Sequence, residues 1–191
     1  MSSKAEAMDA VSTLIRFAGD DPEREGMEDT PSRVVRAFAE WFAGYAVDPR
    51  ELLERTFDEC GGYDEMVVVD GIRFESHCEH HMTPILGTAT VGYIPGDRIV
   101  GISKLARVVD AYSKRFIVQE RMTQQIAEVV NEVLQPRGVG VLVSAEHLCM
   151  TSRGVHKPGS ATITSALLGV FRDDSKVRSE FLDLAREAAR R

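Results

Sequence analysis

The chain has few cysteines and no long apolar run. Only three of its 191 residues are cysteine, which is too few and too odd a number for a disulfide framework. No stretch approaches the ~20 apolar residues of a membrane span, and the opening MSSKAEAMDAV lacks the apolar core of a signal peptide. These absences exclude a disulfide scaffold and a helical membrane protein, and we expect a reduced, cytoplasmic protein.

The chain also has no excess of positive charge. Its net charge of −7 argues against general nucleic-acid binding, which needs a basic surface. A local basic cluster can still bind a small anion. The length suits one domain with a helical extension, and a chain of this size buries roughly 70% of its unfolded surface. A metal is therefore not needed merely to fold it.

The first third of the chain is predicted to be helical. Apolar residues recur at helical spacing from Val11 to Ala18, ahead of Gly19. Thr30 followed by Pro31 predicts an N-cap and the first position of a second helix, and Asp48 followed by proline predicts a third. We expect a helical segment over residues 1–65 and the main domain, ending in a helix, over residues 66–191.

The pattern changes to strands from Met66. MVVVDGIRFES predicts a hairpin turning at Asp70-Gly71, and LGTATVGYI and RIVGI predict two strands around a turn at residues 95–97. Two helices follow, from Ser103 and Gln119, and then two long strands over residues 139–150 and 160–171. The order strand-strand-helix-helix-strand-strand predicts an α+β fold, an antiparallel sheet with helices on one face. Its exposed edges favour pairing with another subunit.

Two short motifs carry metal-ligand residue types. Cys78 and His81 form C-x-x-H, and His147 and Cys149 form H-x-C on a predicted strand, where alternate side chains share a face. Zinc prefers thiolate and imidazole ligands. Either residue of the H-x-C pair could be a ligand on this reasoning. Cys60 has no such neighbour and is interpreted as an incidental thiol.

The number of candidates bears on whether the metal would be structural or catalytic. A closed structural site uses four ligands, but His77 and His80 add to the four residues of the two motifs. A catalytic zinc keeps three protein ligands and one open position, which leaves histidines to move protons. The surplus favours catalysis.

Basic residues gather near the same elements. Together they suggest a polyanion such as a triphosphate as ligand. A helix start at Ser103 would add a hydroxyl and free backbone amides as hydrogen-bond donors to the anion. The candidates are Lys104, Arg107, Arg153, Lys157, Arg33 and Arg36. Glu120, next to Gln119, is favoured as a helix N-terminal carboxylate on sequence alone. The alternative is recognition of guanine, whose adjacent ring N–H and amino groups match a carboxylate.

Five segments resemble the GTP cyclohydrolase I family: CEHH, YIPGDRIVGISKLARVVDAYSKR, VQERMTQQIA, EHLCM and RGVHKPGS. The resemblance runs from about Thr30 to the C-terminal helix. It implies a tunnelling fold and a toroidal homodecamer with active sites at subunit interfaces. It also implies conversion of GTP and water to formate and 7,8-dihydroneopterin triphosphate, the first step of folate or pterin synthesis.

The resemblance also implies roles for individual residues. It implies that the zinc ligands are Cys78, His81 and Cys149 and that the histidines that move protons are His80 and His147. It implies that Glu120 with Gln119 reads guanine and that Ser103 contacts the ribose or a phosphate. The implied triphosphate clamp consists of Lys104, Arg107, Arg153 and Arg33. Arg36 stands where some members carry lysine, which keeps the charge but changes the geometry.

Two other functions agree less well with these residues. A tunnelling-fold relative such as a nitrile reductase uses a cysteine nucleophile and NADPH without a zinc triad, and the intact C-x-x-H and H-x-C motifs argue against it. A catalytically silent, zinc-stabilised assembly protein would need neither His80 nor His147. The presence of both histidines argues against that reading.

Overall fold

The computed structural model describes residues 2–57 and 62–188, so Cys60 lies outside the described residues. The chain divides after Ala43 into two compact units. The division expected after residue 65 stays a prediction, because compactness alone does not define a domain. Within the described residues, no helix is long and apolar enough to cross a membrane.

The first unit is a pair of helices, α1 (Lys4–Phe17) and α2 (Thr30–Trp41). A capping box begins α1: Ser3 Oγ accepts from the Glu6 amide and the Glu6 carboxylate accepts from the Ser3 amide. The prediction of Thr30 as N-cap was wrong by one residue. Thr30 is already helical, and its hydroxyl contacts Met27 Sδ at 3.6 Å instead of capping an amide.

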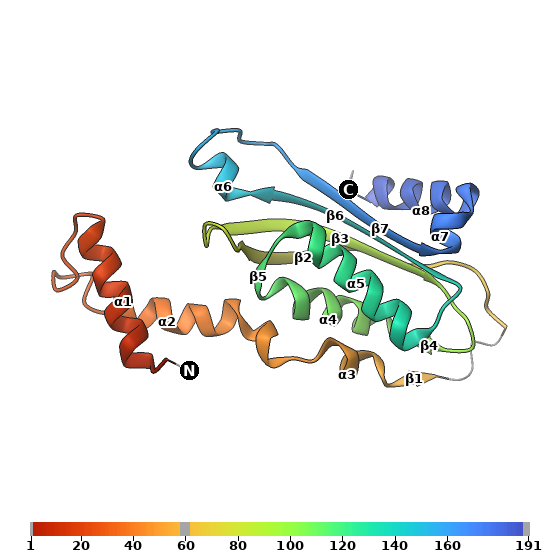
Figure 1. Cartoon of the computed structure of the whole chain (residues 1–191), viewed down its shortest axis with the longest axis horizontal. Coiled ribbons are helices and arrows are strands. Elements are labelled where there is room, and N and C mark those ends of the chain that lie inside the picture. Colours follow the sequence, from red (N-terminus) through yellow and green to blue (C-terminus); the bar gives the residue numbers. More distant parts are fainter. Residues whose placement is uncertain (1, 58–61, 189–191) are drawn as a thin grey trace. The chain divides into compact units, whose positions relative to one another are not determined.

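The second unit is built on a five-stranded sheet in the order β5-β2-β3-β6-β7 (Figure 1). All neighbours are antiparallel except β5, which runs parallel to β2. Its elements follow η1 (Ala43–Ala46) and are α3 (Pro49–Leu53), β1 (Thr56–Phe57), β2 (Val67–Cys78), β3 (Pro84–Ile94), β4 (Ile99–Val100), α4 (Ile102–Ser113), β5 (Phe116–Ile117), α5 (Gln119–Leu134), β6 (Gly138–His147), α6 (Leu148–Thr151), β7 (Thr162–Gly169), α7 (Val170–Asp173) and α8 (Ser175–Ala188). The α+β class is confirmed, with β2, β3, α4, α5, β6 and β7 giving the predicted order.

The predicted hairpin at Asp70-Gly71 was wrong. β2 is one strand that pairs with β3 along its length, with a register shift between Val69 and Ile72. Gly71 has φ +65°, which a β-bulge uses as readily as a hairpin turn does. The Thr90 hydroxyl donates to Asp70 Oδ1 at 2.7 Å and ties the bulge to β3.

The prediction for RIVGI also needs correction. Only Ile99 and Val100 are extended, and they pair with β1 rather than with β3. The Val100 amide donates instead to the Tyr93 hydroxyl at 3.3 Å. The first long antiparallel pair is therefore β2 with β3: the strand before the turn at 95–97 is β3, and it pairs with β2 rather than with the residues after the turn.

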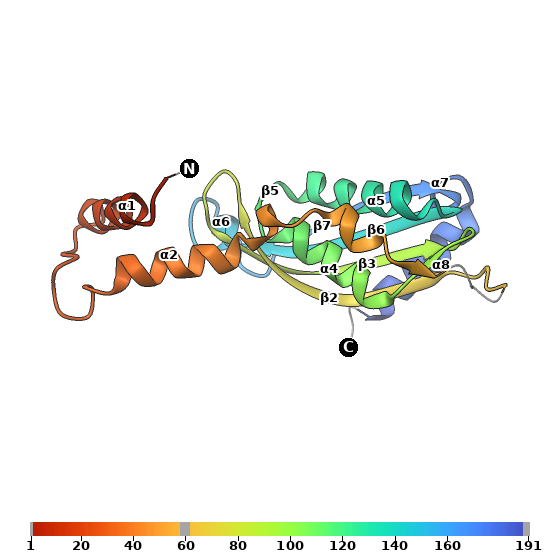
Figure 2. The ribbon, with the colours of Figure 1, turned by 90° about the horizontal axis from the view of Figure 1, so that it is seen from below.

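Helices cover both faces of the sheet. In Figure 2, α4 and α5 lie over one face, as predicted, and α8 lies behind the sheet. The first layer buries alternate residues of β6, among them Val141 and Val143, with the apolar sides of α4 and α5. The intervening Leu142 packs with Phe171 and Phe181 in a second cluster. Both faces of the sheet are therefore covered by apolar packing.

The end of β2, the start of α5 and the end of β6 meet at one end of this sheet. The last two residues of β2 pair with β5, which leads directly into the first turn of α5. The end of β6 is brought alongside by the pairing of His147 with Ile85 of β3. Side chains distant in sequence are thereby gathered at one place.

Candidate active site

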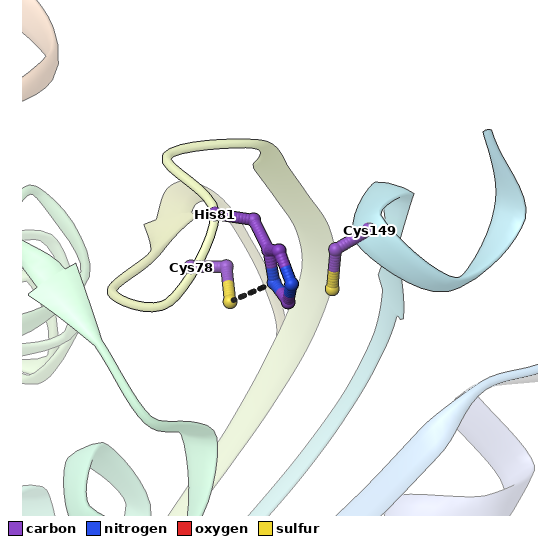
Figure 3. Close-up of side chains that lie close together, drawn as sticks. All are labelled: Cys78, His81 and Cys149. Atoms are coloured by element: carbon purple, nitrogen blue, oxygen red, sulfur yellow. Dashed lines mark hydrogen bonds between the residues drawn. The ribbon is translucent and has the colours of Figure 1, made fainter. Parts of the chain in front are cut away.

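The C-x-x-H motif forms a tight turn between β2 and β3. Cys78 ends β2, and its carbonyl accepts from the Met82 amide at 2.8 Å while its amide donates to Thr83 O at 2.9 Å. His81 lies within this turn, and Cys149 approaches it from α6. Figure 3 shows the three side chains of Cys78, His81 and Cys149 directed toward a common space.

The donor atoms of these three residues lie within 4.8 Å of one another. Cys78 Sγ is 3.8 Å from His81 Nδ1. Burial raises the pKa of the Cys149 thiol, and the neighbouring Cys78 raises it further. A bound cation would reverse this effect by favouring the thiolate. Two sulfurs and one imidazole nitrogen at this separation fit a zinc ion.

Cys149 does not lie on a strand, contrary to prediction. β6 ends at His147, and Leu148–Thr151 form the helical turn α6, which Ser152 closes by donating to Leu148 O. Strand alternation therefore does not explain why His147 and Cys149 share a site. The helical turn redirects the chain, so Cys149 reaches the two residues of the β2–β3 turn while His147 stays beside α5.

A cavity of about 260 Å³ adjoins the three donor atoms. Residues of the β2–β3 turn, the start of α5, the end of β6 and the start of β7 line this cavity. Its polar lining comprises Cys78, His80, His81, Gln119, Glu120, His147, Cys149 and Thr162. Both histidines predicted to move protons and both residues predicted to read guanine thus border one cavity.

The two cavity histidines differ in environment. His80 is 65% exposed, and its Nδ1 lies 3.9 Å from Cys78 Sγ. His147 is half-buried, with Nε2 at 2.7 Å from Gln119 Oε1. Burial lowers the pKa of His147, and the Glu120 carboxylate partly opposes this shift. His147 is therefore held mainly as neutral imidazole at neutral pH, while His80 stands in solvent.

The sequence from residue 7 to residue 186 matches the model of the GTP cyclohydrolase I family. The chain belongs to this family. It is 54% identical over 186 residues to GTP cyclohydrolase 1 of Maricaulis maris (strain MCS10), with 97% of this chain and 91% of that protein covered. A structural comparison finds the apo form of the archaeosine synthase QueF-Like, with a TM-score of 0.46 and 25% identity over 55% of this chain and 93% of that one.

Among the basic residues expected from the family resemblance, Arg153 lies at the site. Its Nη1 is 3.0 Å from His81 Nε2. Ser103, Lys104 and Arg107 do not line the cavity. Ser103 and Lys104 are in the first turn of α4 and Arg107 is in its middle. In Figure 1, α4 begins near β4, at the end of the sheet away from α6.

Arg33 and Arg36 belong to the first unit, on α2. Arg33 pairs with Asp29 at 3.0 Å, and Arg36 Nη1 is 3.4 Å from Ser32 Oγ. Both contacts are exposed and local, so they leave the guanidinium groups able to exchange partners. Their roles in a GTP cyclohydrolase I site stay predictions.

Several supporting residues were not found from the sequence. Glu79 of the β2–β3 turn is paired with Arg121 of α5 at 3.0 Å. Thr162 lines the cavity, and its carbonyl accepts from the Gln119 amide. No motif marks them, because their roles depend on which elements become neighbours. His77 is 6% exposed within β2 and is not one of the Cys78, His81 and Cys149 group.

Proposed function

We propose that this chain is a zinc-dependent GTP cyclohydrolase I that converts GTP and water to formate and 7,8-dihydroneopterin triphosphate, the entry to folate or pterin synthesis. One observation carries the proposal. The Cys78, His81 and Cys149 donor atoms converge within 4.8 Å beside a cavity that His80, His147 and Glu120 also line. Family membership supports the same activity.

The metal would be held by the two thiolates and His81, which is one ligand short of a closed structural site. When bound, zinc supplies the Lewis acidity that activates water near neutral pH. A catalytically silent zinc protein would need no histidines beside the ligands. Both His80 and His147 border the cavity, which supports a catalytic site.

The histidines provide for proton movement around the guanine ring. His147 is half-buried and is held by Gln119, so it would supply a proton to the ring nitrogen that becomes basic as the five-membered ring opens. His80 stands exposed on the β2–β3 turn and would assist opening of the ring and of the ribose. The different exposures fit two separate proton-transfer tasks.

Glu120 is proposed to read the base. Its carboxylate is exposed at the first turn of α5 and lines the cavity. It can accept hydrogen bonds from the ring N–H and amino group of guanine, a pair of donors that adenine does not offer. Gln119 was expected to share this task, and that contact stays a prediction.

The triphosphate site is proposed to need a second copy of the chain. Arg153 contacts His81, which lines the cavity, but Ser103 and Lys104 are in the first turn of α4 and Arg107 is in its middle. A helix of 12 residues is about 18 Å long, and the C-terminal end of α4 is the one that leads through β5 to the cavity. A neighbouring subunit could supply these residues, and the edge strand β7 offers a place for it to pair. A homodecamer with interfacial sites is the proposed assembly.

The test is incubation of purified protein with GTP. We expect stoichiometric formate, a pterin chromophore and about one zinc per chain. ATP, which lacks the guanine donors, serves as the matched control and should release no formate. A zinc-loaded protein that binds GTP but releases no formate would refute the activity. A monomer by native mass spectrometry that is fully active would refute the interfacial site.

A further inference from the structure

We propose that Gln119 is a positioning residue: it fixes the ring of His147 with a proton on Nε2 and leaves Nδ1 to exchange a proton with the substrate. This inference deepens the proposed function and its kinetic part rests on it. The assignment comes from the hydrogen bonds of the buried Gln119 side-chain amide, which determine which side of the amide faces β6 and β7 and which side faces His147.

The Gln119 side chain is 1% exposed, so its polar atoms depend on protein partners. Its Nε2 lies 3.3 Å from Val143 O, 3.0 Å from Thr162 O and 3.1 Å from Thr164 Oγ1. Two of these three neighbours are backbone carbonyls, which only accept hydrogen bonds. An amide rotated by 180° would set its oxygen against both carbonyls. Nε2 therefore faces β6 and β7, and Oε1 faces His147.

Two threonine hydroxyls agree with this direction. Thr123 Oγ1 donates to Gln119 O at 2.8 Å, which uses its only proton. The 2.7 Å contact between Thr123 and Thr164 must then be a donation from the Thr164 hydroxyl. With its proton used in this way, Thr164 Oγ1 accepts from the Gln119 amide. Each hydroxyl hydrogen thus has one consistent position, and the two hydrogens on Gln119 Nε2 are shared among three acceptors.

The consequence for His147 follows from the acceptor that it meets. An amide oxygen cannot donate, so the 2.7 Å contact requires a proton on His147 Nε2. In the neutral ring, Nδ1 then carries the lone pair. Among the described residues, Nδ1 has no hydrogen-bond partner, so it is the nitrogen left to gain and release a proton. The other tautomer would leave Nε2 without a hydrogen for Gln119 Oε1, whereas in this one Nδ1 takes up a proton before it passes one to the substrate.

The same network limits what Gln119 can do for the base. Its two amide hydrogens are shared among acceptors of Val143, Thr162 and Thr164, so neither is left for a ligand in the cavity. Gln119 and Glu120 are consecutive residues in the first turn of α5. One helix start therefore positions the proton-moving histidine through the first residue and the base-reading carboxylate through the second.

The direct test is the tautomer of His147 in the unmodified, zinc-loaded protein. Solid-state NMR of protein labelled with ¹⁵N-histidine distinguishes protonated from unprotonated Nδ1 and Nε2, and the signal missing from His147→Asn identifies the residue. We expect protonated Nε2 and unprotonated Nδ1 at neutral pH. The opposite tautomer would overturn the proposal whether or not the protein shows any activity, which separates this failure from failure of the proposed function.

The kinetic test compares Gln119→Met with Gln124→Met. The first variant removes the acceptor that faces His147, and the second makes the same exchange on the exposed side of α5, where the Gln124 amide contacts Glu128. We expect Gln119→Met to lose the single tautomer and about 10- to 100-fold in kcat, a part of what a positioned acid contributes, with KM and zinc content little changed. Gln124→Met should keep both the tautomer and kcat.

Two results would contradict this role. A rise in KM with unchanged kcat in Gln119→Met would show that Gln119 acts as a base contact instead. Equal losses of kcat in both variants would show that the loss does not come from the contact between Gln119 and His147. If Gln119→Met does not fold, Gln119→Glu, which keeps an oxygen toward His147, and the tautomer of the unmodified protein still decide the matter.

Discussion

Arg153 donates a hydrogen bond to His81, with Nη1 at 3.0 Å from Nε2. His81 Nδ1, on the other side of the ring, faces Cys78 Sγ at 3.8 Å. A neutral imidazole has one lone pair, so a ring that accepts at Nε2 carries its proton on Nδ1. A metal bound at Nδ1 would move that proton to Nε2, which could no longer accept. Metal binding would therefore release the Arg153 guanidinium toward an anionic ligand.

Arg153→Ala should separate metal binding from phosphate binding. We expect zinc to stay at about one per chain, because Arg153 competes with the metal for the His81 lone pair rather than supporting it. KM for GTP should rise about 10- to 100-fold, since a hydrogen bond to a charged group contributes about 1.5–3 kcal/mol. Elemental analysis and steady-state kinetics check this, with Lys176→Ala on α8 as control. Loss of zinc at normal KM would contradict it.

The residues of the H-x-C motif should fail in different ways. Cys149→Ala removes a thiolate from the ligand group and should lose zinc and activity together. His147→Asn should keep zinc and bind GTP, yet lose about 10²–10⁴ in the rate of formate release, the usual contribution of a positioned acid. Zinc content measured beside formate release distinguishes them. The reverse pattern would make His147 the third ligand.

Removing the metal should expose a pair of thiols. Cys78 and Cys149 are both free, and their sulfurs lie within the 4.8 Å group. After chelation and treatment with oxidised glutathione we expect a Cys78–Cys149 disulfide, because the second thiolate lies close enough to displace glutathione from the mixed disulfide formed on the first. Peptide mass spectrometry detects it, and the zinc-loaded protein treated in the same way is the control. Free thiols at both positions in the oxidised apo protein would count against this proximity.

Glu120→Gln should damage recognition of guanine. Losing a charged acceptor at a polar base site costs several kcal/mol of discrimination, so the preference for GTP over ATP should fall on the order of 10³-fold. Zinc content should be unchanged, because Glu120 is not in the ligand group. Glu128→Gln, exposed on the same helix, is the matched control. A GTP preference that survives in Glu120→Gln would refute the role.

Gly140→Ala should destabilise the sheet without affecting the site. A Cβ at this position would lie 2.6 Å from Phe171 Cδ1 and 2.9 Å from Phe181 Cε1. Overpacking of this kind costs about 1–3 kcal/mol, which urea unfolding measures. Phe171→Leu should recover part of the loss, so the double variant should be more stable than the sum of the single changes predicts. Additive losses would show that the ring is not what resists the methyl group.

The sequence by itself determined the features that depend on neighbouring residues. Asp48 before Pro49 correctly predicted a helix start, and Asp48 Oδ1 accepts from the Arg50 amide at 2.9 Å. C-x-x-H predicted that one turn would bring Cys78 and His81 together, and their contact is confirmed. The α+β order followed from periodicity, and the family resemblance predicted Cys149 as the third metal ligand. The predicted cytoplasmic location remains untested.

Tertiary structure decided everything that depends on which distant segments become neighbours. Gly71 suits a hairpin turn or a bulge equally, and only the pairing of β2 with β3 selects the bulge. The alternation of side chains likewise did not predict that β6 ends at His147 and that a helical turn carries Cys149. The direction of the Gln119 amide depends on the carbonyls of Val143 and Thr162. Every residue has a carbonyl, so sequence does not mark the ones that matter; the β6–β7 register and the packing of α5 do.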